Sequence, residues 1–220
     1  MFIITQNLRH WWWDRFKELI RMCIIENPDV IVLTERRNNK QDLFDSMNVG
    51  YKQYIINDIP WVKNTVCILT KDTAMIKKSY NHNILVLEYK WITIWWVYFP
   101  QKNEKKWVFD FIDSNLSKTN SIVIGDFNTW KHYIDESWKS FYCHDEFTYL
   151  SEEKLTDARR TRFINSVEYS RYSNAWNWFR IDHILVTSDI DRNISEVWYH
   201  HQVREKWLSD HSMMFLNLQA

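Results

Sequence analysis

Polar and acidic side chains mark the ends of several short apolar runs in this chain of 220 residues. Such runs are typical of buried strands, and catalytic groups of layered α/β folds commonly gather where strands end. The sequence therefore predicts one functional site built from strand ends. Its candidate members are Asn7, Glu35, Asp126, Asn128, Asp182, Asp210 and His211.

The chemistry of this set is that of a hard cation and a phosphate ester. Most of its members offer carboxylate or amide oxygens, none is a cysteine, and His211 is the one imidazole. Oxygen ligands suit Mg²⁺ or Mn²⁺ rather than zinc, and an Asp–His pair beside such a cation suits phosphate-ester hydrolysis. A single Asp after a strand more often caps a turn, so the inference depends on the combination.

The elements that must position these side chains are strands with few helices between them. An apolar repeat of three and four predicts a helix through residues 12–24, ending before Asn27-Pro28, and a second helix is expected through residues 107–112. Many strands with scattered helices favour two sheets packed face to face with helices outside. Runs of β-branched or aromatic residues predict strands at Phe2–Thr5, Val30–Thr34, Val66–Thr70, Ile84–Glu88, Trp91–Phe99, Ser121–Ile124, Ile181–Thr187 and Met213–Leu218.

The composition excludes several function classes. The 28 Lys and Arg balance 28 Asp and Glu, which excludes a basic binder that depends only on phosphate neutralisation. With 14 Trp but only 2 Gly, a fold that needs many tight glycine turns is disfavoured. Three widely spaced cysteines without a CxxC pair indicate reduced thiols rather than a disulfide framework or a thiolate zinc site.

The chain shows no sign of a membrane segment or a linker. No apolar run approaches the roughly 20 residues of a transmembrane helix, and no secretory signal is visible at the N-terminus. We therefore expect a cytoplasmic protein without a membrane partner. Apolar runs recur along the whole chain, which favours a single domain over residues 1–220, and we expect a monomer.

Five short motifs follow one another along the chain: residues 4–7 (ITQN), 28–35 (PDVIVLTE), 124–128 (IGDFN), 180–182 (RID) and 209–211 (SDH). They resemble, in the same order, the motifs of the endonuclease/exonuclease/phosphatase superfamily, which includes deoxyribonuclease I and exonuclease III. Three shorter matches resemble the exonuclease III and abasic-site endonuclease branch: Tyr98 in a YFPQ segment, Arg160 in a D-x-x-R segment, and Phe179 three residues before Asp182.

The resemblance implies an α/β fold, a four-layered α/β sandwich with two packed mixed β-sheets flanked by helices. It also implies a divalent-metal-dependent phosphodiester hydrolase. Glu35 would bind Mg²⁺ or Mn²⁺, with Asn7 close to it and Asp210 supporting the metal site. Gly125 would allow the close turn that aims Asp126 into the site, because a side chain there would obstruct it.

The same resemblance implies the remaining catalytic roles. Asp126, held by Asn128, would orient or deprotonate the attacking water. His211 would contact the scissile phosphate, and Asp182 would fix its tautomer and favour its protonated form. Tyr98 would stabilise the phosphate or the leaving group.

Basic and aromatic residues near the motifs are candidates for substrate contact. We expect phosphate contacts from arginines beside motif residues and an aromatic wall before Asp182. By contrast, Lys105 and Lys106 are expected on a solvated face, and Trp95 and Trp96 are expected to pack on opposite faces of one strand. The candidates for substrate binding are Arg9, Arg36, Arg160, Trp176, Trp178 and Phe179.

Several functions fit this sequence. The leading one is a nuclease whose partner is nucleic acid, specifically DNA, and Tyr98 and the arginine positions favour it. The alternatives are a phosphatase or phosphodiesterase for a small nucleotide, inositol or lipid phosphate, and an RNA nuclease. A catalytically silent binding module is disfavoured because every motif acid is present. The short segment between Arg160 and Asp182 argues against abasic-site specificity more than against hydrolysis itself.

Overall fold

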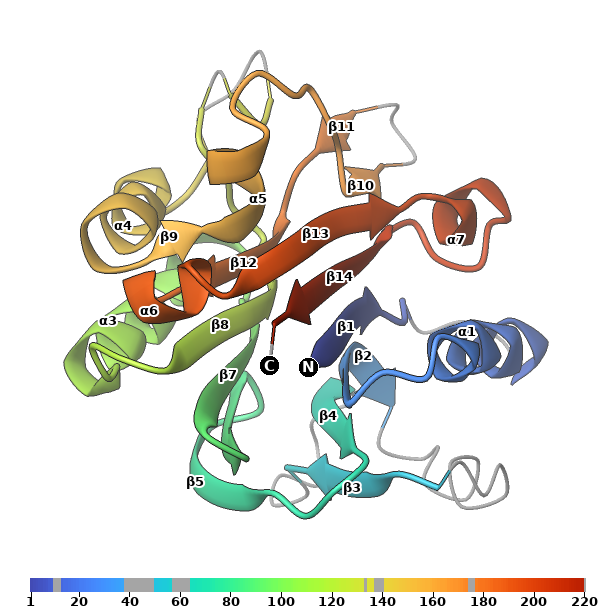
Figure 1. The fold of residues 1–220 in the computed structure, drawn as a ribbon. Coiled ribbons are helices and arrows are strands. Elements are labelled where there is room, and N and C mark those ends of the chain that lie inside the picture. Colours follow the sequence, from blue (N-terminus) through green and yellow to red (C-terminus); the bar gives the residue numbers. More distant parts are fainter. Residues whose placement is uncertain are drawn as a thin grey trace.

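In the computed structural model, the described residues form two six-stranded sheets, one two-stranded hairpin and several helices. It describes residues 1–9, 13–37, 50–56, 64–132, 134–136, 141–173 and 177–219. None of the helices in these ranges has the length and apolar character needed to cross a lipid bilayer. Figure 1 shows the chain with its elements labelled.

The first sheet is mixed and contains both chain ends. Its single parallel pair is β1–β2, and the other neighbours are antiparallel. Its order is β13 (Ile194–His200), β14 (Met213–Leu218), β1 (Phe2–Asn7), β2 (Val30–Arg37), β4 (Asn64–Thr70) and β3 (Lys52–Ile55).

The second sheet has the same plan, with one parallel pair, β7–β8, among antiparallel neighbours. A separate hairpin pairs β10 (Arg171–Tyr172) with β11 (Trp178–Phe179). The order of the second sheet is β5 (Met75–Tyr80), β6 (Ile84–Tyr89), β7 (Ile92–Tyr98), β8 (Ser121–Asp126), β12 (Asp182–Val186) and β9 (Thr156–Asp157).

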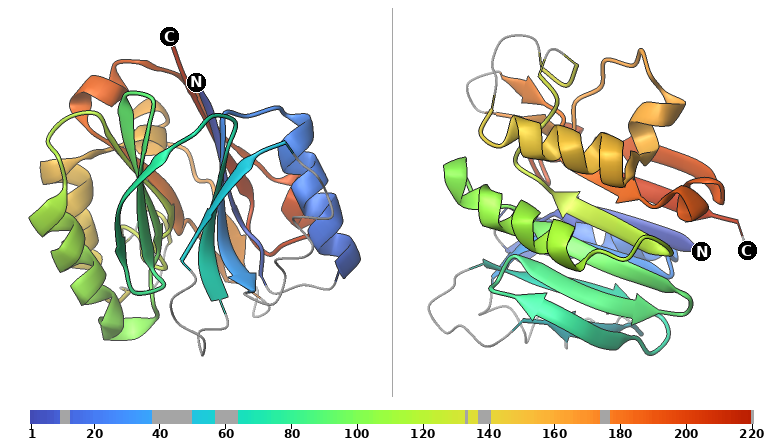
Figure 2. Two further views of the ribbon diagram at one scale, coloured as in Figure 1. Left: turned by 90° about the horizontal axis from the view of Figure 1, so that it is seen from below. Right: turned by 90° about the vertical axis from the view of Figure 1, so that its left-hand side faces the viewer.

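The two sheets pack face to face, and helices cover their outer faces (Figure 2). On the first sheet, the apolar stripe of α1 (Trp13–Ile25), which includes Phe16, Leu19 and Cys23, packs against residues such as Ile31. On the second sheet, α3 (Lys106–Asn115) and α4 (His144–Tyr149) contribute to the outer cluster. The shorter helical segments are η2 (Lys102–Lys105), η3 (Leu150–Lys154), α5 (Ala158–Arg162), α6 (Ser188–Asp191) and α7 (Gln202–Glu205).

The predicted four-layered α/β sandwich is confirmed by this arrangement. Each of the eight predicted strands has a counterpart within a few residues, and both predicted helices are present. Trp95 and Trp96 pack on opposite faces of β7, Trp95 under the helices and Trp96 between the sheets, as their adjacent positions require. The sequence pattern does not predict β3, β5, β9, β10, β11, β13, α4 or the short helical segments.

Candidate functional site

The predicted catalytic residues converge at one end of the sandwich because of the strand directions. The parallel pairs β1–β2 and β7–β8 each carry two carboxyl-terminal strand ends to the same edge. Strand β12 runs antiparallel to β8, so its first residue, Asp182, lies opposite Asp126, and Tyr98 lies opposite Asp126 on the other side. His211 enters the same edge just before β14, which pairs antiparallel with β1.

Glu35 reaches this edge through a β-bulge. The pairing of β2 with β4 shifts between Leu33 and Arg36, so β2 contains one extra residue there. Glu35 has a φ of +56°, a left-handed backbone conformation that non-glycine residues rarely adopt. Bulges re-aim side chains at sheet edges and next to active sites, and here the bulge directs Glu35 toward the neighbouring sheet, where it accepts a hydrogen bond from Tyr98 Oη at 3.2 Å.

Asn7 joins the two central carboxylates. Its Nδ2 donates to Glu35 Oε1 at 3.2 Å and to Asp126 Oδ2 at 3.0 Å. The backbone N–H of Arg9 donates to Asn7 Oδ1 at 2.9 Å, and this bond fixes which end of the amide faces the carboxylates. Asn7 therefore presents its nitrogen, not its oxygen, to the acidic group.

Gly125 allows the two sheet neighbours β7 and β8 to approach closely at the site. Its φ is +142°, and a Cβ at this position would lie 2.0 Å from Val97 O. This is the steric reason expected for glycine before Asp126, although the obstruction comes from the adjacent strand rather than from the turn itself.

Asp126 is buried among other charges. Burial and the nearby carboxylate of Asp182 raise the pKa of Asp126 to about 7, and positive charge on His211 opposes that rise. A carboxyl group with a pKa near neutrality can hold or release a proton under physiological conditions. Its Oδ1 accepts the backbone N–H of Asn128 at 2.8 Å, which fixes the orientation of the carboxylate.

A buried lysine supports the loop that carries Asn128. Asn128 has a φ of +50°, and its side chain donates to Phe99 O at 2.8 Å and accepts from Gln101 Nε2 at 2.8 Å. Lys105 Nζ donates to the carbonyl oxygen of Asn128, and Lys105 is 0% exposed. The prediction that Lys105 lies on a solvated face is therefore wrong: the turn from η2 into α3 directs it inward, and burial lowers its pKa to about 8.

Asp182 and His211 form a buried pair. His211 Nδ1 lies 2.8 Å from Asp182 Oδ2, and the backbone oxygen of Asp182 accepts from Tyr199 Oη at 2.5 Å. Burial alone would lower the pKa of His211, but the Asp182 carboxylate outweighs it, and the pKa rises to about 9. The imidazole therefore carries a proton on both nitrogens at neutral pH, with Nδ1 directed at Asp182.

Asp210 is bracketed by two arginines. Its Oδ1 lies 3.3 Å from Arg9 Nε and its Oδ2 lies 3.3 Å from Arg171 Nε, while His211 Nε2 is 3.9 Å from Oδ1. The Asp210 carboxylate outweighs burial and raises the pKa of Arg171. Arg171 lies outside every motif, so the sequence does not predict it, and its pairing beside His211 places it here.

The donor chemistry of this end of the molecule fits a hard divalent cation. Carboxylate oxygens of Asp126 and Asp182 lie within 4.8 Å of one another, and Glu35 shares the amide of Asn7 with Asp126. Carboxylate oxygens are the ligands that Mg²⁺ and Mn²⁺ prefer. Because Asp210 is already compensated by two arginines, Glu35 and Asp126 offer the less compensated negative charge.

Tyr98 keeps its proton. Burial and the charge of Glu35 raise the pKa of Tyr98 well above its ordinary value. Its hydroxyl therefore donates at neutral pH, and its single hydrogen can turn from Glu35 to an anionic substrate.

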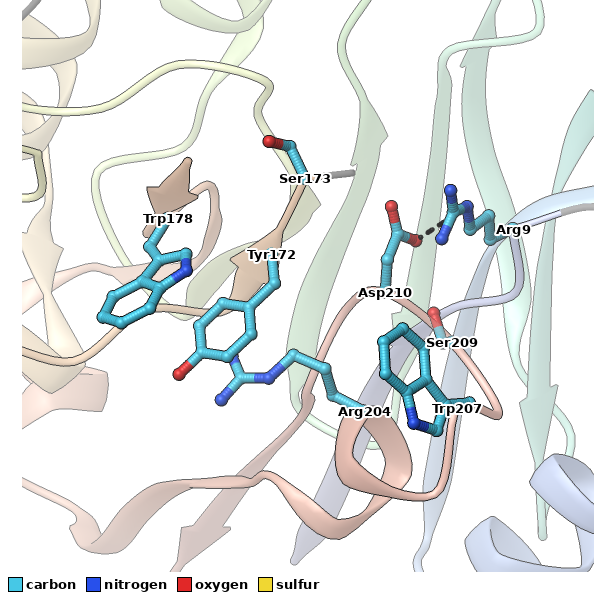
Figure 3. A pocket seen from close by; sticks show the side chains of 8 residues that line it. All are labelled: Arg9, Tyr172, Ser173, Trp178, Arg204, Trp207, Ser209 and Asp210. Carbon is cyan, nitrogen blue, oxygen red and sulfur yellow. Dashed lines mark ion pairs between the residues drawn. The ribbon is translucent and has the colours of Figure 1, made fainter. Parts of the chain in front are cut away.

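The predicted substrate-binding residues do not lie together. Arg9 and Trp178 line a pocket of about 210 Å³ beside Asp210 (Figure 3). Phe179 points elsewhere and stacks on Trp130, with ring centroids 4.7 Å apart. The side chain of Arg36 and the whole of Trp176 lie outside the described residues.

Arg160 does not join the predicted catalytic residues. Its guanidinium pairs with Asp135 and donates to the carbonyl oxygens of Ile164 at 3.2 Å and Ser166 at 3.1 Å. Arg180 also pairs with Asp135, Nε to Oδ1 at 2.6 Å, and with Asp157, NH2 to Oδ2 at 2.7 Å. The arginines of the D-x-x-R and RID segments thus share one buried ionic network.

Solved structures with the same fold include nucleic-acid enzymes. A 3′ phosphatase, NExo, from Neisseria bound to a product DNA hairpin superposes with a TM-score of 0.85 at 17% identity, and an AP endonuclease from Archaeoglobus fulgidus with a TM-score of 0.84 at 16% identity. A 3′-5′ exonuclease, also NExo, from Neisseria meningitidis gives a TM-score of 0.83 at 17% identity. Each comparison covers 100% of both chains.

The sequence itself also matches a family profile. The profile of the endonuclease/exonuclease/phosphatase family matches residues 4–211, which include all five motifs from Asn7 to His211. This chain belongs to the endonuclease/exonuclease/phosphatase family.

Proposed function

We propose that this protein is a divalent-metal-dependent phosphodiester hydrolase that acts on DNA. One observation carries the proposal: the Asp182–His211 pair lies at the same strand edge as the two carboxylates that share the amide of Asn7. A protonated imidazole can stabilise negative charge that develops on a phosphate oxygen, and a carboxylate of near-neutral pKa beside it can accept a proton from water.

Each residue has a specific task in this proposal. Glu35, with Asp126 beside it, would hold Mg²⁺ or Mn²⁺, and the cation would supply positive charge next to the phosphate. Asp126 would orient the attacking water and accept its proton, while Asn128 N–H fixes the carboxylate. His211 would donate from Nε2 to a phosphate oxygen, and Tyr98 would donate from its hydroxyl to the phosphate or the leaving group.

DNA is the proposed substrate class for two reasons. The solved structures of similar fold include a 3′ phosphatase bound to a DNA hairpin and an AP endonuclease. In this chain, Arg9 and Arg171 place positive charge beside the catalytic edge, although the whole chain is neutral. Local positive charge is sufficient to attract a polyanion.

A substrate panel tests the proposal. Purified protein is incubated with Mg²⁺, Mn²⁺ or EDTA and with labelled intact duplex, nicked duplex, abasic-site duplex, single-stranded DNA, RNA and small phosphate esters. We expect cleavage of one or more DNA substrates that requires the metal and is lost with EDTA. Hydrolysis of small esters or RNA alone would overturn the assignment of DNA.

Two variants test the residue roles. Asp126→Asn and His211→Ala should each lower the rate by about 10³-fold or more, because each removes a group that acts in the transition state. A matched control is Asp145→Asn, which changes an exposed carboxylate of α4. Near-normal activity in Asp126→Asn or His211→Ala would contradict the assigned mechanism.

A further inference from the structure

A pocket lined by aromatic rings and guanidinium groups lies beside Asp210. It holds about 210 Å³ between the β10–β11 hairpin and the loop that follows α7. Figure 3 shows that Arg9 and Asp210 lie along one side of this pocket and that Tyr172 and Trp178 lie on the other. The pocket therefore opens directly beside the catalytic edge.

One wall of the pocket is a stack of planar groups. The rings of Tyr172 and Trp178 are stacked with centroids 5.0 Å apart, and the guanidinium carbon of Arg204 lies 3.4 Å from the centroid of Tyr172. Arg204 NH1 also donates to Tyr169 O at 2.7 Å, which fixes the guanidinium in place. A wall that is already ordered loses little entropy when a flat ligand binds to it.

The opposite rim carries an exposed indole. Trp207 is 73% exposed and has a φ of +57°, an unusual backbone for a large side chain. Its backbone oxygen accepts from Arg15 NH1 at 3.2 Å, and its N–H donates to Arg204 O at 2.9 Å, so the backbone that carries the indole is held. An aromatic side chain held in solvent next to a pocket is a ready stacking partner for a base.

We propose that this pocket takes the unpaired base of a nucleotide that adjoins the scissile phosphate. The inference rests on the proposed function and deepens it. Aromatic and guanidinium planes stack on any base regardless of its sequence, and Arg9 adds a guanidinium to the side of the pocket that carries Asp210. A base within a duplex is covered on both faces by its neighbours, so it must leave the stack to enter.

A pocket for an unpaired base would make the enzyme selective for frayed or single-stranded positions. We therefore expect weaker binding when the nucleotide beside the scissile phosphate is paired or lacks its base. The binding step should respond more than the chemical step, because the pocket touches the neighbouring nucleotide rather than the reacting atoms.

Kinetics on matched oligonucleotides test this selectivity. One sequence is made with a paired base, an unpaired base or a tetrahydrofuran residue at the position on either side of the scissile phosphate. For wild type, removal of the unpaired base should raise KM about tenfold or more. In Trp207→Gly, which retains the positive φ, and in Arg204→Met, KM for the unpaired substrate should rise by a similar factor, with kcat within about twofold. Trp91→Ala is the matched control, since Trp91 is 47% exposed and precedes β7 at the end opposite Tyr98.

A second readout separates this inference from the proposed function. Tryptophan fluorescence of the protein in EDTA is titrated with deoxyadenosine 5′-monophosphate and with deoxyribose 5-phosphate. We expect quenching by the nucleotide only, and we expect Trp207→Gly to weaken it. Absence of DNA cleavage together with base-dependent quenching would overturn the proposed function alone. DNA cleavage with no effect of the base or of the variants would overturn the base pocket alone.

Discussion

The single side-chain nitrogen of Asn7 donates to both Glu35, at 3.2 Å, and Asp126, at 3.0 Å, and so connects the first sheet with the second. Two carboxylates that converge on one donor are held together despite their like charge, because the amide offsets part of their repulsion. The bond from Arg9 N to Asn7 Oδ1 prevents the amide from turning over.

Asn7→Asp should disable the site without changing its shape. The substitution keeps the acceptor for Arg9 N but replaces the shared donor with a third negative charge. We expect kcat/KM at pH 7 to fall by about 10²-fold or more. The pH–rate profile should also shift to higher pH, because the added negative charge raises the pKa of Asp126 further. Asn193→Asp, which lies in an exposed turn, serves as the control, and an unchanged profile in Asn7→Asp would contradict the role given to the amide.

The His211–Asp182 pair should make stability depend on pH in the metal-free protein. The folded-state pKa of His211, about 9, is raised above the ordinary value near 6.5. The pair therefore contributes about 3 kcal/mol to the free energy of unfolding at pH values below about 6.5. This contribution is lost as the pH rises through about 9. Urea denaturation in EDTA at several pH values should show this loss in wild type and not in His211→Gln. The assignment would be refuted if the free energy of unfolding changed with pH equally in the two proteins between pH 6 and 10.

Gly125→Ala should destabilise the fold strongly. The added Cβ would lie 2.0 Å from Val97 O, a backbone atom of the neighbouring strand, so β7 and β8 must separate. We expect a loss of about 3 kcal/mol or more. Gly50→Ala is the matched control, because Gly50 also has a positive φ, +71°, but nothing lies within 4 Å, so only about 1 kcal/mol of backbone strain is expected. Equal effects at the two glycines in chemical denaturation would show that close approach is not the reason for Gly125.

Arg180→Met should also destabilise the protein, through a different mechanism. Asp135 and Asp157 are buried, and Arg180 holds the pKa of both carboxyl groups below the ordinary value against the effect of burial. Without Arg180 these charges lose their main partner, and a loss of about 3–5 kcal/mol is expected. Lys106→Met, which removes an exposed pair with Asp110, should leave the denaturation midpoint unchanged.

Lys105→Met should affect activity more than Lys106→Met does. Lys105 Nζ is the buried donor to the carbonyl of Asn128, whereas the neighbouring Lys106 faces solvent. Loss of this donor leaves the carbonyl without its charged partner and loosens the loop that orients Asp126, so kcat should fall about tenfold. The kcat of each variant is measured on one substrate at saturating metal. Equal kcat values for Lys105→Met and Lys106→Met would contradict the role given to Lys105.

Much of the fold could be predicted from local pattern. Buried strands such as β8 and β14 consist of continuous apolar runs, and the stripe of α1 repeats at the helical period, so both are visible in the sequence. Strand β5 (Met75–Tyr80) was missed because most of its residues are exposed, and its sequence therefore carries little apolar signal. Strand β13 was missed because polar residues interrupt its apolar ones.

The sequence by itself determined the candidate catalytic residues, since Asn7, Glu35, Asp126, Asp182 and His211 occupy ordered motifs at strand ends. Only the tertiary structure decided what each charge faces. Arg171 meets Asp210 across 39 residues and Arg180 meets Asp135 across 45, separations at which local periodicity carries no information about contact. The same holds for the adjacent residues Trp178 and Phe179: the strand places them on opposite sides, but packing of Trp130 against one and of Tyr172 against the other decided which of them reaches the pocket.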